Sequence, residues 1–174
     1  MTLTACGGSP ARDSVRTETD PIQSPASVAP KRDYRTYYPP GTHKASRAAV
    51  RVITRWSEEL RAGHVRRAAR YFDVPALVQN ATPLIKLESR QDVFEFNRAL
   101  PCGAHIVRTI AGGRYTVATF VLTERPGSHG CGATGKLAAT AFLLRHGKIS
   151  EWRRVLVPPP LGPDKNLKQS LPAN

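Results

Sequence analysis

The sequence of 174 residues predicts one α+β domain, and three observations lead to this prediction. Apolar residues in the first half of the chain recur at three- and four-residue steps, as on one face of a helix. From residue 105 onward they alternate with polar residues, as along a strand, and short glycine-rich segments separate these runs. Helices followed by a run of antiparallel strands are typical of an α+β fold, in which a curved sheet covers the apolar face of a long helix.

Two helices are expected at the start of the domain. Ser46 is placed to cap the first helix, which presents one apolar face as far as Gly63. A glycine at this position can adopt the left-handed backbone conformation that commonly ends an α-helix. A second, short helix is expected from Val65 through Phe72, and Pro75 would stop it.

A third helix and the sheet follow along the chain. Ser89 and Asp92 have the spacing of a capping box, which predicts a helix start before the apolar residues Val93 and Phe96. A short strand is expected at 76–78. The main strand-like runs are residues 105–110, 115–123, 137–144 and 149–155.

Composition divides the chain into three parts. Residues 1–45 comprise the N-terminal start and a flexible linker. The linker is expected because residues 7–45 contain six prolines and show no apolar period. Residues 46–157 form the predicted domain, and residues 158–174 a tail. The net charge is +13, and residues 46–157 carry 18 basic against 8 acidic residues. These basic residues are scattered and do not form one face of a helix, which favours a general cationic surface over a nucleic-acid reader.

The sequence around the N-terminal cysteine bears on the cellular location of the protein. Residues 3–9, Leu-Thr-Ala-Cys-Gly-Gly-Ser, resemble the cleavage box of bacterial lipoproteins, in which the cysteine thiol is modified with diacylglycerol. The resemblance implies an extracytoplasmic protein anchored to the cell membrane through Cys6. A secretory signal also needs a charged start and an apolar core, which Met1 to Ala5 do not supply. Two alternatives therefore remain: a start upstream of Met1, or an ordinary terminal cysteine in a protein that is not lipidated.

Cys102 and Cys131 are expected to form a disulfide if the protein is exported. Two reduced cysteines in a cytosolic protein are the alternative. A metal site is not expected, because His105 and His129 lack the spacing of metal-ligand pairs. No cofactor motif is present either, since the glycines between 127 and 135 do not join a strand to a helix.

Two segments resemble the NTF2-like/SnoaL-like superfamily. The first runs from Trp56 to Gly63 and continues as Ala-Ala-Arg-Tyr-Phe at residues 68–72. The second is Phe-Leu-Leu-Arg-His-Gly-Lys-Ile-Ser-Glu-Trp-Arg at residues 142–153. The resemblance covers about residues 46–157 and implies a cone-shaped α+β barrel with a pocket between a curved sheet and the helices. Members of this superfamily include enzymes, ligand-binding proteins and protein-binding modules, so the fold does not decide the function.

The ketosteroid isomerases of this superfamily offer a residue-by-residue test. Their tyrosine donor falls on Trp56, their aspartate base on Asn80 and their protonated aspartate on Thr140. An amide does not accept and return a proton near neutral pH, and a hydroxyl is a weaker donor than a carboxylic acid. This chain is therefore not expected to catalyse the isomerase reaction.

We expect a non-catalytic, lipid-anchored accessory protein whose domain binds a small hydrophobic ligand or a protein partner, with a homodimer also possible. The alternative is a cyclase, isomerase or dehydratase that uses Asp73 and His105 as acid and base. Glu151 is expected on the strand face opposite Trp152. The residues expected to line the pocket are Trp56, Tyr71, Phe96, Tyr115, Thr119, Thr140 and Trp152.

Overall fold

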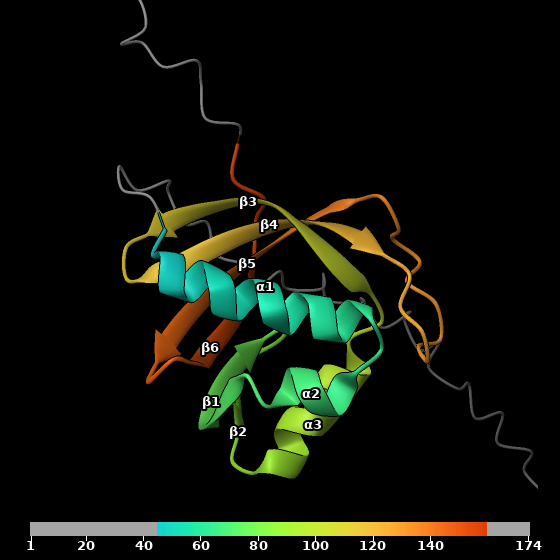
Figure 1. The fold of residues 1–174 in the computed structure, drawn as a ribbon, viewed down its shortest axis with the longest axis horizontal. Coiled ribbons are helices and arrows are strands. Elements are labelled where there is room, and N and C mark those ends of the chain that lie inside the picture. The colour runs from blue at the N-terminus through green and yellow to red at the C-terminus, as the bar shows by residue number, and fades with distance from the viewer. Residues whose placement is uncertain (1–44, 160–174) are drawn as a thin grey trace, which may run out of the picture. The chain divides into compact units, whose positions relative to one another are not determined.

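The computed structural model describes residues 45–159 (Figure 1). The segment around Cys6, the predicted linker up to residue 44, and residues 160–174 of the predicted tail lie outside the described residues. The helices are α1 (Arg47–Arg61), α2 (Val65–Ala69) and α3 (Arg90–Ala99). The strands are β1 (Phe72–Gln79), β2 (Ile85–Leu87), β3 (Gly103–Gly112), β4 (Tyr115–Thr123), β5 (Leu137–Arg145) and β6 (Lys148–Val155). The predicted α+β class is confirmed.

The six strands form one curved sheet in the order β2-β1-β6-β5-β4-β3. Strands β3 to β6 are antiparallel neighbours, as predicted for consecutive strand-like runs that short glycine-containing segments separate. Strand β1 lies parallel to β6, although about 70 residues separate them along the chain. Helix α1 crosses one face of the sheet, and α2 and α3 lie beside its β1 end (Figure 1).

The second helix is shorter than predicted. It ends at Ala69, and Phe72 opens β1, where it pairs with Ile149 of β6. Phe72 is fully buried, and its ring contacts Trp56. The prediction of a helix through Phe72 is therefore wrong, because pairing with a distant strand and burial of a large ring outweigh the local helical pattern. Asp73 consequently lies in a strand.

The main core lies between the helices and the concave face of the sheet. Trp56 of α1 stands at its centre and meets the rings of Phe72, Phe120 and Phe142 edge-on, at centroid distances of 6.1, 6.4 and 5.4 Å. Edge-to-face pairs of this kind add about 0.5–1.5 kcal/mol each to the stabilisation from burial. The tryptophan thereby joins the long helix to three separate strands.

A second buried cluster lies on the opposite face of the sheet. Its members are small or branched residues at alternating positions of β3 to β6: Ile110, Val117, Ala139, Ala141 and Val155. Both faces of the central strands are therefore buried, which explains why their sequences are almost continuously apolar.

Two local predictions, the capping box of α3 and the glycine after α1, are confirmed. The Ser89 hydroxyl accepts from the Asp92 backbone, and the Asp92 carboxylate accepts from the Ser89 backbone, which completes the capping box. Gly63 adopts a φ of +80°, and a Cβ there would lie 2.9 Å from the Pro126 carbonyl oxygen. Only glycine fits both requirements.

The loop between β4 and β5 is attached in two ways to the C-terminal end of α3 and the segment that follows it. Cys102 and Cys131 form a disulfide with a Cα separation of 4.5 Å, so the predicted pairing is confirmed. Arg125 is buried, and its guanidinium donates to the carbonyl oxygens of Arg98 and Leu100 at distances of 3.0 and 2.7 Å. A cation at a helix C-terminus satisfies carbonyls that have no partner within the helix.

Candidate functional site

Aromatic side chains fill the part of the interior around Trp56 and Trp152, where the predicted pocket residues were expected to surround a ligand. Phe96 meets Trp152 at a centroid distance of 5.2 Å, and Trp56 meets Phe142 at 5.4 Å. Trp56, Trp152 and Thr140 are 3%, 4% and 2% exposed, respectively. These residues were expected to surround a ligand, and instead Phe96 and the two tryptophans pack against other rings of the core.

The polar atoms of the two tryptophans have different surroundings. Trp56 Nε1 donates to Asn97 Oδ1 at 2.9 Å, and Asn97 is itself fully buried. The Asn97 amide donates in turn to the Val93 carbonyl at 2.8 Å. Trp152 Nε1 is buried without an acceptor in the described part of the chain. The donor that the isomerase comparison assigns to Trp56 therefore serves to join α1 to α3.

Two of the expected lining residues do not face this interior. Tyr115 packs against the second cluster, and Thr119 pairs with Ala139 of that cluster, so both lie on the opposite face of the sheet. Their expected place beside the interior is wrong, because the register of β4 turns these odd-numbered positions away from the helices. Tyr71 is half-buried and lines a surface hollow beside α1 and α2.

Tyr115 belongs to a network centred on the carboxylate of Glu151, which is buried on the face opposite Trp152. Glu151 accepts from the Tyr115 hydroxyl at 2.8 Å, from Arg114 at 3.1 Å and from Arg153 at 2.7 Å. Burial by itself raises the pKa of this carboxyl, but hydrogen bonds from Arg153 and Tyr115 and the nearby positive charges outweigh burial and lower it. Glu151 therefore stays ionised at neutral pH and joins β6 to the start of β4.

The candidate acid and base of the enzyme alternative do not converge. Asp73 lies on β1 and His105 on β3, with three strands between them. Four inter-strand steps of about 4.8 Å place them about 19 Å apart along the sheet. The Asp73 carboxylate accepts from the Val74 N–H at 3.0 Å, and His105 is exposed. Asn80, where the isomerase base would fall, is exposed beyond the end of β1.

A partly open pocket lies between the first half of α1 and the sheet. Its volume is about 290 Å³, at the lower end of the range typical of small-molecule sites. Helix α1 and the residue before it supply small or apolar side chains, and β4, β5 and the turns at their ends supply the opposite wall. The lining residues are Ser46, Ala48, Ala49, Val52, Arg114, Thr116, Phe142, Leu144 and Gly147. We call this the α1–sheet pocket.

The sequence predicted a pocket between the sheet and the helices, but none of the seven residues expected to line it lines this one. The signal for half of it was present, because Ala49 and Val52 belong to the predicted apolar face of the first helix. The other half depends on which strands lie under that helix, and this follows only from the tertiary structure. Thr116 and Phe142 are directly paired across β4 and β5, so one register determines both positions.

The structure of residues 45–159 bears on metal binding and on membrane insertion. In this part of the chain no group of three or more histidine, cysteine, aspartate or glutamate side chains is arranged to hold a metal ion. Its helices also include none with the length and apolar character needed to cross a membrane.

Comparison with known proteins relates the chain to solved structures. No protein-family model and no curated protein matches it. It is similar to an NTF2-like protein of unknown function from Burkholderia xenovorans, with 13% identity, coverage of 73% of this chain and 96% of that one, and a TM-score of 0.47. A second NTF2-like protein of unknown function, from Cytophaga hutchinsonii, is 9% identical, with coverage of 64% and 92% and a TM-score of 0.48.

A third similar structure is a protein with a ketosteroid isomerase-like fold from Catenulispora acidiphila, solved in complex with trimethylamine. It is 12% identical, the match covers 60% of this chain and 84% of that one, and the TM-score is 0.46. Likeness at these identities concerns the fold alone and transfers no activity.

Proposed function

We propose that the domain is a non-catalytic binding module of an exported, membrane-tethered protein, and that its ligand is a small apolar molecule. The observation that carries this proposal is the α1–sheet pocket, whose walls include Val52, Phe142 and Leu144. Apolar burial supplies most of the affinity in sites of this kind, and a few polar groups orient the ligand. Thr116 and Ser46 offer hydroxyl groups for that purpose.

The packing of the interior favours binding over catalysis. The enzyme alternative uses Asp73 and His105 as an acid–base pair, which requires both groups within hydrogen-bond reach of one substrate, either directly or through one water. Asp73 and His105 lie on different strands, and the carboxylate of Glu151 is bound by Tyr115 and two arginines on the other face of the sheet. None of these three residues lines the α1–sheet pocket.

The disulfide supports export of the protein. Disulfides persist in oxidising compartments and are rare in the cytosol, and Cys102 and Cys131 are joined. Together with the lipoprotein-like segment around Cys6, this supports an extracytoplasmic position and attachment to the membrane by acyl chains. We expect the protein expressed in its native host to partition into detergent, and the Cys6→Ser variant to partition into the aqueous phase. Equal partition of both forms would contradict the anchor.

Binding can be tested with a neutral apolar dye, N-phenyl-1-naphthylamine, whose fluorescence rises on burial. The protein is expected to bind it, and Ala49→Trp is expected to weaken binding at least tenfold by filling the pocket. Ala99→Trp is the matched control, because Ala99 is an exposed helical residue outside the pocket. Val52→Phe provides a second filling variant if Ala49→Trp does not unfold cooperatively. Absence of dye binding by the unaltered protein would refute the small-ligand proposal and leave a protein partner as the remaining function.

A further inference from the structure

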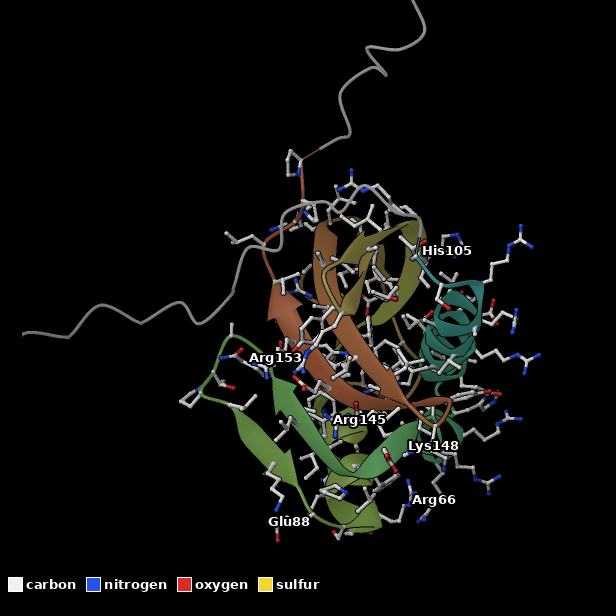
Figure 2. The ribbon with its side chains drawn as sticks, turned by 90° about the vertical axis from the view of Figure 1, so that its left-hand side faces the viewer. Arg66, Glu88, His105, Arg145, Lys148 and Arg153 are labelled. Carbon is white, nitrogen blue, oxygen red and sulfur yellow. A yellow bond between two sulfur atoms is a disulfide. The ribbon has the colours of Figure 1, made fainter. Side chains whose placement is uncertain are left out.

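A second hollow, on another part of the surface, is lined by positive charge. It lies between α2, α3 and the first residue of β6, has a volume of about 500 Å³, and we call it the cationic groove. Its lining residues are Arg66, Ala69, Arg70, Arg90, Gln91, Phe94 and Lys148. Figure 2 shows Arg66 and Lys148 on the same side of the domain, although they come from α2 and β6. Four cations and no carboxylate line this groove.

Two of the arginines are held in place by neighbouring groups. Arg66 stacks over the ring of Phe94 with its guanidinium carbon 4.9 Å from the ring centroid. Arg90 donates through Nη1 to the carbonyl oxygen of Phe72 at 2.7 Å. Each guanidinium keeps further N–H donors beyond these contacts. Such positioning lowers the entropy lost when an anion binds.

Carboxylates on the neighbouring elements are already engaged with other groups. Glu59 of α1 accepts from His64 at 2.9 Å and pairs with Arg67 at 3.1 Å. On α3, Asp92 belongs to the capping box and Glu95 pairs with Arg98. Within residues 45–159, none of the four cations of the groove forms an ion pair with a carboxylate. The positive charge of the groove is therefore not neutralised by this part of the chain.

We propose that the cationic groove binds a compact, multiply charged phosphate group. A phosphate ester carries about 1.5 to 2 negative charges near neutral pH and offers three acceptor oxygens. A carboxylate offers one charge and would neutralise a quarter of the local excess. Guanidinium groups match phosphate oxygens with paired N–H donors, and the groove supplies three guanidiniums and one ammonium.

The phosphate has two possible sources, a soluble phosphate compound or the headgroup of an anionic lipid. Their shared chemistry is the same set of phosphate oxygens, and the apolar surface of Phe94 and Ala69 would contact whatever carbon group adjoins them. This proposal does not depend on the α1–sheet pocket, because the two sites share no lining residue.

The soluble source is tested by isothermal titration of the full chain with pyrophosphate near 0.15 M salt, where general surface attraction is screened. We expect binding, and we expect the triple variant Arg66→Gln, Arg70→Gln, Lys148→Gln to weaken it by at least tenfold. A charge-assisted hydrogen bond contributes enough for about tenfold per lost donor group. The matched control is the triple variant Arg47→Gln, Arg51→Gln, Lys136→Gln, which removes the same charge from exposed positions outside the groove.

The lipid source is tested by co-sedimentation with phosphatidylglycerol vesicles and with phosphatidylcholine vesicles, using Cys6→Ser protein so that acylation does not contribute. The ligand is a lipid headgroup if the protein binds the anionic vesicles, the triple variant in the groove loses this binding, and the control triple variant keeps it. The ligand is a soluble phosphate compound if the triple variant in the groove loses binding to pyrophosphate and the unaltered groove does not bind the vesicles. Equal weakening by the two triple variants, or no binding to either probe, overturns the proposal. Lys148→Gln alone serves as a milder variant should the triple variant fail to unfold cooperatively.

Discussion

The hydrogen bond between Trp56 and Asn97 gives a sharp test of how α1 is held to α3. Both residues are buried, and the indole N–H donates to the amide oxygen at 2.9 Å. Trp56→Phe keeps an aromatic ring in the core but removes the donor. It therefore leaves the Asn97 oxygen buried without this partner. Trp152→Phe is the matched control, because Trp152 is equally buried and its indole N–H has no acceptor in the described part of the chain.

The magnitude follows from two terms. The smaller ring leaves a cavity, which costs about 1–2 kcal/mol, since complete truncation of a buried tryptophan costs about 3–5 kcal/mol. The unsatisfied amide oxygen adds about 1–3 kcal/mol. Trp56→Phe should therefore lower the free energy of unfolding by about 2–5 kcal/mol. Trp152→Phe should lower it by no more than the cavity term, because it also removes a buried N–H that has no acceptor in the described part of the chain.

Urea denaturation of four proteins measures the coupling: the unaltered chain, Trp56→Phe, Asn97→Leu and the double variant. Removing both partners leaves neither polar group unsatisfied, so the double variant should be more stable than the sum of the single losses implies, by about 1–3 kcal/mol. Additivity within about 0.5 kcal/mol would refute the reasoning. So would equal losses for Trp56→Phe and Trp152→Phe.

Two further predictions concern the opposite face of the sheet and the covalent bridge. Folding lowers the pKa of Glu151 below its usual 4.5, so its stabilisation is complete above that pH and is lost as the pH falls through the lower, folded value. Glu151→Gln should therefore lower the free energy of unfolding by about 1–3 kcal/mol at pH 7 and by much less near pH 3, measured by urea denaturation; a loss independent of pH would contradict this. Replacing Cys102 and Cys131 together by serine should lower it by about 3–4 kcal/mol, because the bridge closes a loop with a sequence separation of 29. An unchanged thermal midpoint in reducing agent would contradict the second prediction.

Elements determined by neighbouring residues could be predicted from the sequence. The capping box of Ser89 and Asp92, the helix end at Gly63 and the strands β3 to β6 all depend on groups within a few residues of each other. The disulfide also followed, because two cysteines of an exported domain have few alternatives. The helix through Phe72 was predicted wrongly, since its local period is helical while its partner Ile149 is far along the chain.

The candidate sites depended on contacts that no local pattern contains. Seven aromatic and hydroxyl-bearing residues were expected around one interior, but the register of the sheet sends Tyr115 and Thr119 to the other face, and ring packing fills the space beside Trp56. Both hollows have walls from three or more elements.

The amino-acid sequence by itself thus determined the fold class, the order of the three helices, the four strands β3 to β6 and the cysteine pairing, because hydrophobic periods, caps and turns act over short distances. Only the tertiary structure decided which side chains meet. The parallel pairing of β1 with β6 brings Lys148 to the same groove as Arg66 and Arg90. Burial of rings from distant elements likewise fills the interior around Trp56, because packing depends on volume shared in space and not on separation along the chain.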